Sequence, residues 1–410
     1  MATYQRGDKK IYGMTIPENM KSTNLKPERE NAWEVGLDWR FLDSRIGVDL
    51  TYYKENTRNQ IMTINVPWES GVKEKLINAG NIQNSGIEIA LNTTPIKKKQ
   101  WQWDLNFTYT RNRNKIVELS PDVTSYINLD GAANYGNYRI ASVAKVGSDY
   151  GMLMSDSWIK TDAKTGTPVV GYTNKFRTVY YKRGGTVKEV GSMLPNFLGS
   201  LNSTLRWKDL SLYVLFDARF GGYVASYNSR YATAYGFSGE TEKYRKGMTW
   251  TSKYANAQDK VFTDGFIPDV VFDAGTIVTT PGGTNQDVSG MTYQEAYEKG
   301  YVEPAHLQSA AYFKNSWGTG VINDDWFKKI NYIALREITL SYNVPTKICS
   351  YIGAKNLSLS FTGRNLAYLL NTAPNHENPE SVRGTGAAQF RMRSFMPYTA
   401  SYLFTLNATF

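Results

Sequence analysis

The sequence has few of the residues that carry metal, thiol or imidazole chemistry. One cysteine, Cys349, and two histidines, His306 and His376, occur among 410 residues. A lone cysteine excludes a disulfide framework and a cysteine metal cluster, and two distant histidines exclude an all-histidine metal site. The sequence also has no Gly-x-Ser-x-Gly elbow and no phosphate-binding Gly-Lys-Ser/Thr run. We therefore expect no catalytic residue, no metal and no cofactor, and we do not expect an enzyme.

Long hydrophobic runs are missing as well. The longest unbroken apolar stretches have five residues, Leu212 to Phe216 and Leu366 to Leu370, whereas a membrane-spanning helix needs about 20. Any insertion into a membrane must therefore use strands. The abundant residues are Tyr (29), Phe (17), Trp (10) and Gly (34). This usage is typical of strands and turns with aromatic girdles.

The charge balance is basic but diffuse. There are 47 Lys+Arg and 37 Asp+Glu, for a net charge of +10. No Lys/Arg-rich helix or nucleic-acid motif accompanies the basic residues, so we do not expect nucleic acid as a partner. The charge fits an anionic surface such as lipopolysaccharide as well as it fits an ordinary solvated exterior. No signal peptide is visible after Met1.

Nine segments alternate apolar and polar residues with a period of two, which predicts strands. They are 33–41, 46–52, 87–92, 101–110, 197–207, 210–220, 338–344, 357–362 and 402–410. The last segment ends on Phe410, with Tyr402, Phe404 and Leu406 at alternate positions before it. This pattern resembles the closing strand of bacterial outer-membrane barrels; the alternative is an edge strand of a soluble β-sandwich.

The connections between these segments alternate in length. Short turns follow the first, third and fifth segments, about a dozen residues follow the seventh, and roughly 20 to 100 follow the even ones. Outer-membrane barrels have short periplasmic turns and long extracellular loops. We therefore predict an all-β, antiparallel transmembrane β-barrel segment in the cell outer membrane, with a periplasmic carboxyl terminus. Because bacterial single-chain barrels have an even number of strands, nine cannot close one, and we expect the later part of a larger barrel.

The predicted organisation has two parts. Residues 1–31 are polar and turn-rich and are expected to be the end of an extracellular loop. Residues 32–410 are expected to form a partial barrel, with long loops at about 112–194, 221–328 and 367–394.

Five stretches resemble segments of one protein family. They are Leu25-Lys26-Pro27-Glu28 with Asn31 to Asp38, then Asn78 to Glu88, Gly191 to Phe197, Tyr332 to Pro345, and Gly363 to Leu366. The first two resemble the Leu-x-Pro-Glu…Trp-Glu-x-Gly and Asn-x-Gly-x-x-x-Asn-x-Gly-x-Glu motifs of TonB-dependent receptors. The others are similar to segments of the SusC/RagA branch, the nutrient importers of Bacteroidota. Within these motifs Gly80 and Gly86 are expected to serve the backbone, through a positive φ or a close strand approach.

The resemblance implies a barrel of about 22 strands with a plugged lumen. Members import oligosaccharides or peptides with energy delivered by TonB, and many carry a SusD-like surface lipoprotein as a lid. We expect the plug, the TonB-contacting box and the earlier strands to be absent from this chain, so the TonB complex is expected to act only through a plug that these 410 residues do not contain. Outer-membrane lipid, lipopolysaccharide and the barrel assembly machinery are the other expected partners. The alternatives are a surface adhesin or passive barrel that binds a ligand through its long loops, and a soluble β-rich binding protein.

The long loops are rich in aromatic residues, which stack on sugar rings and pack peptide side chains. The candidate substrate-binding residues are Trp158, Tyr180, Tyr181, Tyr231, Tyr235 and Trp250. Such loops equally fold on themselves or grip a partner lipoprotein. The paired loop carboxylates Asp324 with Asp325 and Glu377 with Glu380 have no pocket signature, so we expect them to be solvated charges.

Overall fold

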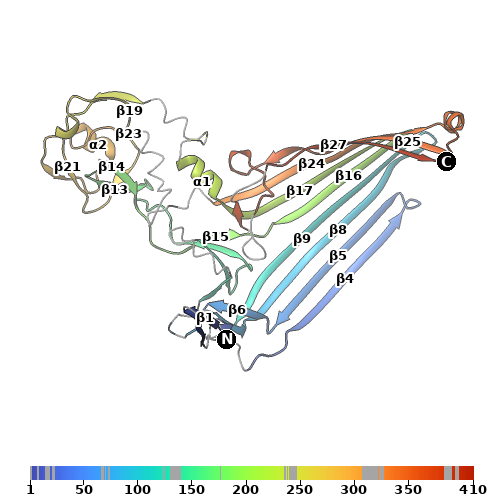
Figure 1. Ribbon diagram of the computed structural model, residues 1–410, viewed down its shortest axis with the longest axis horizontal. Coiled ribbons are helices and arrows are strands. Elements are labelled where there is room, and N and C mark those ends of the chain that lie inside the picture. The colour runs from blue at the N-terminus through green and yellow to red at the C-terminus, as the bar shows by residue number, and fades with distance from the viewer. Residues whose placement is uncertain are drawn as a thin grey trace.

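The structure, a computed structural model, is built around one large antiparallel sheet. It describes residues 2–6, 9–13, 19–20, 24–65, 69, 71–72, 74–121, 123, 125–129, 140–175, 177–234, 237, 239, 247–306, 322, 327–382, 390–392 and 397–410. The nine long strands of the sheet are β4 (Arg29–Phe41), β5 (Ile46–Arg58), β8 (Gly80–Lys98), β9 (Trp101–Leu119), β16 (Phe197–Trp207), β17 (Leu210–Ser226), β24 (Phe327–Val344), β25 (Asn356–Asn371) and β27 (Ser401–Thr409). Each pairs with the next along the chain (Figure 1), and the short β26 (Arg391–Met392) lies beside β17. The predicted antiparallel all-β fold and its nine strands are confirmed.

Several strands extend further than the alternation predicted. β9 continues past Thr110, and β8 begins well ahead of Ile87. The added parts pair polar residues, such as Asn84 with Asn114. A strand whose outer side no longer carries apolar residues keeps its hydrogen-bond ladder but has no reason to keep apolar residues at every second position. The sequence pattern therefore ends where the apolar face ends, before the strand itself ends.

The turn between β8 and β9 is tighter than the gap between the predicted strands 87–92 and 101–110. β8 continues to Lys98, and only residues 99–100 form the turn. Pro95 fits inside the strand because the register of β8 against β9 shifts beside it. A residue at such a bulge does not need the N–H group that proline lacks.

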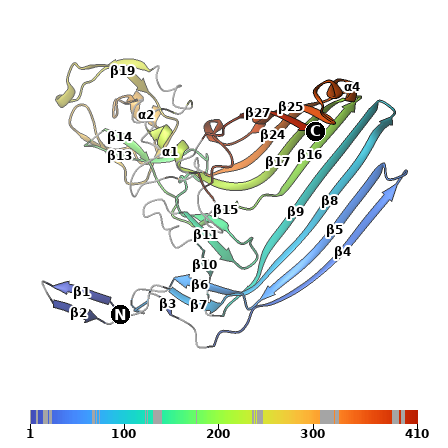
Figure 2. The same cartoon turned by 45° about the vertical axis from the view of Figure 1, so that its right-hand side comes forward.

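The turns and the long connections lie at opposite ends of the sheet, which we call the turn end and the loop end (Figures 1 and 2). The turn end carries residues 42–45, 99–100 and 208–209. It also carries a longer connection with helix α4 (Thr346–Cys349) and the 3-10 turn η6 (Ser350–Ile352). All other connections between the nine strands are at the loop end. The alternation in connection length that the sequence predicted is therefore an alternation between the two ends of the sheet.

Short elements fill the loop end. They are β1 (Ala2–Arg6), β2 (Lys9–Gly13), β3 (Asn19–Met20), β6 (Ile61–Asn65), β7 (Glu74–Asn78), β10 (Tyr126–Asn128), β11 (Ile140–Lys145), β12 (Met152–Ser155), β15 (Lys188–Ser192), α1 (Tyr227–Ala234) and η7 (Pro374–His376). β6 and β7 pair with each other, and β10, β11, β12 and β15 form a small sheet. No helix among the described residues is long and apolar enough to cross a membrane.

The two faces of the main sheet differ in chemistry, as the alternation predicted. One row of paired positions crosses six adjacent strands with Trp39, Val48, Leu91, Phe107, Leu201 and Phe216. Trp39 is 59% exposed and Phe107 41% exposed. We call this side the apolar face. Exposed aromatic and aliphatic side chains in continuous rows fit lipid rather than water.

The opposite side, the polar face, carries ladders of small hydrogen-bonding side chains. The hydroxyls of Thr339 and Thr362 lie 2.9 Å apart, and those of Ser341 and Ser360 also lie 2.9 Å apart. The carboxamide of Asn202 donates to that of Asn106 at 3.3 Å. These side chains satisfy one another without apolar cover, as the inner wall of a wet lumen requires.

A compact lobe stands beyond the loop end (Figure 1). We call residues 158–182 together with 248–306 the loop lobe. Its elements are β13 (Val169–Thr173), β14 (Thr178–Tyr181), β18 (Met248–Thr251), η4 (Ala255–Ala257), β19 (Val261–Phe266), β20 (Val271–Phe272), β21 (Ile277–Thr279), β22 (Asn285–Asp287), α2 (Tyr293–Glu298) and β23 (Ala305–His306). Buried residues of both segments, among them Val170, Phe272 and Tyr293, form one hydrophobic core. A lobe with its own core was not predicted from the sequence, which shows no regular period in these segments.

Candidate functional site

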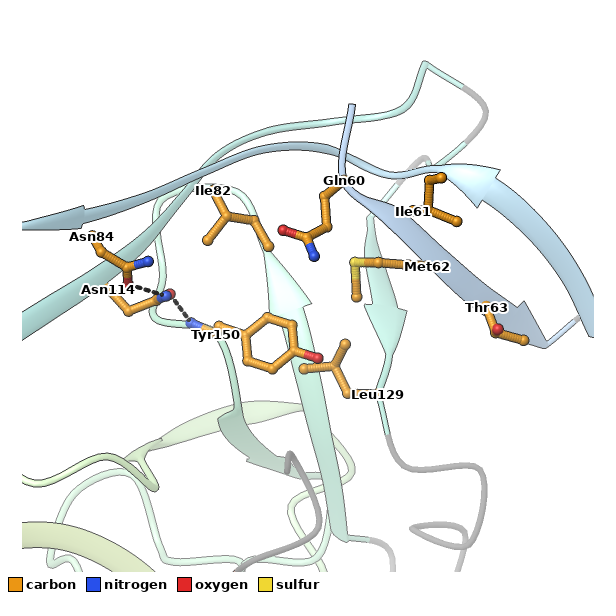
Figure 3. A pocket seen from close by; sticks show the side chains of 9 residues that line it. All are labelled: Gln60, Ile61, Met62, Thr63, Ile82, Asn84, Asn114, Leu129 and Tyr150. Carbon is orange, nitrogen blue, oxygen red and sulfur yellow. Dashed lines mark hydrogen bonds between the residues drawn. The ribbon is translucent and has the colours of Figure 1, made fainter. Parts of the chain in front are cut away.

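A cavity of about 480 Å³ lies at the loop end of the polar face (Figure 3). Its lining residues are Gln60, Ile61, Met62, Thr63, Ile82, Asn84, Asn114, Leu129 and Tyr150. Ile82 and Asn84 belong to β8, and Asn114 to β9, so the main sheet supplies one wall. β6 and the segments around Leu129 and Tyr150 supply the rest. The cavity therefore sits where the small sheets of the loop end meet the polar face.

Hydrogen bonds fix the polar wall of this cavity. The amide nitrogen of Asn114 donates to Asn84 Oδ1 at 2.8 Å, and its oxygen accepts from the backbone N–H of Tyr150 at 2.9 Å. Figure 3 shows Gln60, Met62 and the ring of Tyr150 facing the same space. Burial raises the pKa of Tyr150, so its hydroxyl stays neutral at ordinary pH.

The lining combines an apolar floor with neutral polar groups. Ile82 belongs to a buried cluster with Ile77, Ile116 and Ile127, against which Met62, Leu129 and Tyr150 pack. Above this floor lie three carboxamides and two hydroxyls, and none of the described lining residues is charged. Such a surface can bind an uncharged polar ligand through hydrogen bonds and apolar contacts together. Sugar rings and peptide backbones have groups for both kinds of contact.

A second cluster on the polar face centres on Arg336 of β24. Its guanidinium donates to Asp217 Oδ2 of β17 at 2.7 Å and to both carboxylate oxygens of Glu380 at 2.7 Å. Tyr368 of β25 and Tyr332 of β24 donate their hydroxyls to Glu380 at 2.8 and 3.3 Å. Five side chains from three strands and the last connection thus form one hydrogen-bonded network.

The local backbone explains the position of Arg336. The register of β24 against β17 shifts here: Leu335 pairs with Phe216 and Glu337 with Leu215, so Arg336 is an extra residue in that ladder. A bulge re-aims a side chain, and here Arg336 joins Glu337 on the polar face, where Glu337 accepts from Arg364 at 2.8 Å. Burial alone would raise the pKa of Glu380, but hydrogen bonds from Arg336 and Tyr368 outweigh it and lower that pKa.

The expectation that Glu377 is a solvated charge is wrong, and Glu380, although exposed, is held in the hydrogen-bonded network of Arg336. Glu377 is only 6% exposed, and Asn228 donates to its carboxylate at 3.4 Å. Burial raises the pKa of Glu377. These carboxylates lie in a connection that folds back over the sheet, and sequence spacing alone does not reveal such long-range contacts. Asp324 and Asp325 lie outside the described residues.

A further cavity of about 560 Å³ lies beside Glu377. Tyr231 of α1, His376, Asn378 and Tyr398 help to line it. Asn375 and His376 both have positive φ angles, 53° and 55°. Non-glycine residues rarely adopt this conformation, which persists where surrounding contacts enforce it.

The candidate aromatic residues lie in three different places. Trp158 stacks on Phe327 with centroids 6.1 Å apart and donates its ring N–H to the Ser155 carbonyl at 2.7 Å. Tyr231 packs against the same buried cluster and is the candidate that lines the 560 Å³ cavity.

The remaining candidates belong to the loop lobe or lie outside the described residues. Tyr181 packs against the lobe core, and Tyr180 lies over Gly171, where an added Cβ would meet its ring at 2.5 Å. Trp250 stacks on Phe262 with centroids 4.9 Å apart. Tyr235 lies outside the described residues. The structure therefore does not bring the described candidates together into one site.

The residues of the carboxyl-terminal pattern lie on β27 and just after it. Tyr402, Phe404 and Leu406 face the same side as Phe361 and Leu359 of β25, on the apolar face. Tyr402 is 66% exposed and Phe410 72% exposed.

Sequence reasoning missed the Arg336 network and the neutral cavity. Arg336 and Glu337 place two charges in succession in the middle of a strand, which breaks the alternation and was the available signal for a bulge. The cavity had no such signal, because its lining comes from separate segments of ordinary residues. Among the described residues, no group of three or more His, Cys, Asp or Glu side chains could hold a metal ion.

Comparison with known proteins identifies the fold. Residues 3–223 match the family described as "TonB dependent receptor-like, beta-barrel". The chain is 23% identical over 368 residues to TonB-dependent receptor P26 of Formosa agariphila, which covers 86% of this chain and 31% of that protein. It is 30% identical over 149 residues to TonB-dependent receptor SusC of Bacteroides thetaiotaomicron, covering 36% of this chain and 15% of SusC. The chain thus spans a third or less of these relatives.

A solved structure supports the same conclusion about the fold. The structure of the RagAB peptide transporter superposes with a TM-score of 0.58 and 14% sequence identity, over 93% of this chain and 35% of that chain. The RagAB peptide importer in its "open-open" state gives a TM-score of 0.59 at 14% identity. The family match covers more than half of the chain, in the part that contains β4 to β17. The chain belongs to the TonB-dependent receptor family, which is not a family of enzymes, as part of its outer-membrane β-barrel.

Proposed function

We propose that this chain is the carboxyl-terminal barrel part of an outer-membrane nutrient importer of the SusC/RagA type, which takes up oligosaccharides or peptides. The observation that carries the proposal is the neutral cavity of about 480 Å³ at the loop end of the polar face. It offers hydrogen-bonding groups over an apolar floor at the mouth of the wet side of the sheet. A passive structural barrel has no need of such a lining at that place.

The open edges of the sheet indicate how the barrel is completed. Among the described residues, β4 and β27 have no strand paired on their outer sides. Open strand edges leave backbone N–H and C=O groups unsatisfied in hydrocarbon. We infer that further strands pair with both edges to close a barrel of about 22 strands around a plug. Coupling to the TonB complex then acts through that plug.

The difference between the two ends supports an orientation. Barrels of this class keep short turns in the periplasm and long loops outside. The carboxyl terminus and the turn end are therefore assigned to the periplasm, and the loop lobe to the cell surface. Residues 1–31 and the connections near 112–194, 221–328 and 367–394 then belong to the extracellular side. A SusD-like lipoprotein is proposed as the surface partner of that side, since the chain is similar to SusC and many importers of the SusC/RagA type carry such a lipoprotein.

The aromatic residues of the loops remain proposed contacts to the cargo, and the structure supports some of these proposals better than others. Tyr231 has the most, because its ring borders the cavity beside Glu377 and Tyr398. Trp158, Tyr180, Tyr181 and Trp250 have less, because each packs against neighbouring side chains of its own lobe or cluster.

The test is uptake by cells that make the native protein. We would compare cells with and without the gene for uptake of labelled peptides and labelled oligosaccharides, with and without an uncoupler of the inner-membrane proton gradient. If the protein is an importer, cells should lose uptake of either the peptides or the oligosaccharides when the gene is deleted, and should lose the same uptake when the uncoupler is added. Surface binding that survives uncoupling, without uptake of either class, would replace the importer by the adhesin alternative.

A further inference from the structure

The apolar face of β9 ends abruptly in three basic residues. Trp101, Trp103, Leu105, Phe107 and Tyr109 occupy successive positions on this face, and Arg111, Arg113 and Lys115 continue the same series toward the loop end. Arg113 and Lys115 are exposed, and Arg111 is half-buried. Because the basic residues occupy the same alternate strand positions as the apolar ones, their side chains project outward, away from the lumen.

The strand register adds a fourth cation and shows what lies between them. Lys54 of β5 pairs with Ser85 of β8, and Ser85 pairs with Arg113 of β9. The next row toward the loop end is Asn56, Gln83 and Lys115. Adjacent strands are about 4.8 Å apart, so Lys54 and Arg113 stand about 10 Å apart across a short serine side chain. Two long basic side chains can converge on one anionic group over that gap.

Aromatic pairs mark the membrane boundary directly below this patch. The ring centroids of Tyr109 and Phe197 lie 5.3 Å apart, and Phe197 stacks on Phe220 with centroids 4.8 Å apart. At the opposite boundary, Trp101 stacks on Trp207 at 5.6 Å. Aromatic girdles sit at the two lipid–water interfaces of a membrane barrel.

The distance between the two aromatic levels agrees with a bilayer. Trp101 and Tyr109 are eight residues apart, or about 26 Å along a strand, which is about 20 Å across the membrane at a tilt of about 40°. The apolar band of such barrels is about 25 Å tall. Arg111 therefore begins at the level of the lipid headgroups.

The patch is suited to an anion because few carboxylates compete for it. No ion pair joins Lys54, Arg111, Arg113 or Lys115 to an acidic residue among the described part of the chain. A groove of about 520 Å³ beside β9 is lined by Arg111, Arg113, Pro195 and, as its carboxylate, Asp149. The nearest carboxylate on β9 itself is that of Glu118, which lies one row beyond Lys115 toward the loop end.

The acidic residues of β5 and β8 nearest to the patch lie on the other side of the sheet. Glu55 and Glu88 alternate with the outward positions and therefore face the polar side. The cations therefore lie on the outer side of the sheet and these carboxylates on the inner side. A surface that met only water on both sides would not need such a separation of charge. The guanidinium group binds phosphate through two parallel N–H···O bonds, and the lysine ammonium binds it as a point charge.

We infer that Lys54, Arg111, Arg113 and Lys115 form a binding site for the phosphate groups of lipid A, the phosphorylated glycolipid of the outer leaflet. The inference rests on the proposed function for its orientation, because the loop end must face the outer leaflet. Lipid A carries phosphate on a rigid disaccharide, which suits cations spread over neighbouring strands. The site anchors the barrel wall at a fixed depth next to the loop end.

The test uses the native protein purified from outer membranes. The variant carries K54Q, R111Q, R113Q and K115Q together. The matched control carries K97Q, K98Q, K99Q and K208Q, which remove four charges at the turn end. Both are incorporated into lipid nanodiscs of neutral phospholipid and titrated with lipid A. We expect at least about tenfold weaker lipid A binding by the first variant, since each exposed ion pair contributes a factor of about two to five. The control should bind as the unchanged protein does.

Two further measurements keep the outcome decisive. Heat-modifiable migration on gels shows whether the first variant still forms a folded barrel, and a milder R111K and R113K variant, which keeps the charge but loses the bidentate geometry, should bind with intermediate affinity. Equal lipid A binding by the first variant and the control overturns the inference. So does binding of phosphatidylglycerol as tight as that of lipid A. Cargo uptake is also measured in the cells that make each variant. A failure of the proposed importer function is thereby distinguished from a failure of the proposed lipid site.

Discussion

Arg336 and Glu380 are joined by two N–H···O bonds of 2.7 Å, although one lies in the middle of β24 and the other in the connection that precedes β27. The side chain of Arg336 is 21% exposed and that of Glu380 39% exposed. A two-bond guanidinium–carboxylate pair with fixed geometry holds a loop more firmly than a single-contact surface pair. This pair ties the last connection to the polar face of the sheet.

Replacing Glu380 by glutamine should loosen that connection. The E380Q change turns an amide N–H₂ group toward Arg336 and removes the charge, which we expect to cost about 1 to 2 kcal/mol of local stability after discounting for exposure. The measurement is amide hydrogen exchange of residues 372–382. The control is E337Q, which breaks the single bond to the more exposed Arg364. Unchanged protection in E380Q would show that the pair does not hold the connection.

Gly80 should tolerate no side chain. Its φ is 135°, and an added Cβ would lie 2.0 Å from the carbonyl oxygen of Glu118 on β9. The close strand approach expected for this glycine is thus present, and G80A should destabilise the barrel by about 2 to 4 kcal/mol. The check is the temperature at which the protein loses its folded gel mobility. The control G36A adds a Cβ whose nearest neighbour lies at 3.8 Å, so it should change that temperature little.

The loop lobe should weaken in acid. Asp273 accepts a hydrogen bond from Lys160 at 2.7 Å and lies 3.6 Å from Lys182. Burial alone would raise the pKa of Asp273, but the bond and charge of Lys160 and the charge of Lys182 outweigh it, so this pKa is lower than that of an ordinary aspartate.

A carboxyl group whose pKa is lowered by folding stabilises the fold above its unfolded-state pKa, and this contribution is lost as the pH falls through the folded-state pKa. We therefore expect the thermal unfolding temperature of the lobe to fall on acidification from about pH 5 to below the lowered pKa. The D273N variant should show a smaller fall, whereas D269N, at an exposed position, should behave as the unchanged protein. An identical fall in D273N would remove Asp273 from the explanation.

Trp158 and Tyr231 should respond differently to truncation. Trp158 stacks on Phe327 within a buried cluster, so W158A should lower stability by about 2 to 4 kcal/mol. Tyr231 borders a cavity, so Y231A should weaken cargo binding with a smaller loss of stability. Thermal unfolding and cargo affinity are measured on both variants. A Trp158 variant of normal stability that loses cargo binding would reverse this assignment.

The main sheet could be predicted from the sequence because its environment has two sides. A strand between lipid and water must alternate, so Trp101 to Thr110 showed both its existence and its faces. The same logic failed for Asn112 to Leu119, where Ile116 packs against segments of the loop end while Arg113 and Lys115 face outward, so the ladder continues without an apolar–polar alternation.

The site could not be predicted to the same degree. Arg336 meets Glu380 only because a bulge re-aims one and a returning connection delivers the other. The cavity of Figure 3 is assembled from β6, β8 and β9 together with Leu129 and Tyr150, whose residue types are unremarkable in their own segments. Contacts at such sequence separations depend on the tertiary fold and leave no local period.

The core of the loop lobe is shared between two connections that flank the hairpin of β16 and β17. Val170 of the first pairs in parallel with Phe272 of the second, and the side chain of Asn174 accepts from Thr279 and donates to Ile277. Neither half can bury its apolar residues without the other. Insertions or deletions in one connection must therefore be matched in the other, and a chimera that exchanges only one of them with a relative would lose the lobe. The two connections constitute a single unit of evolutionary exchange.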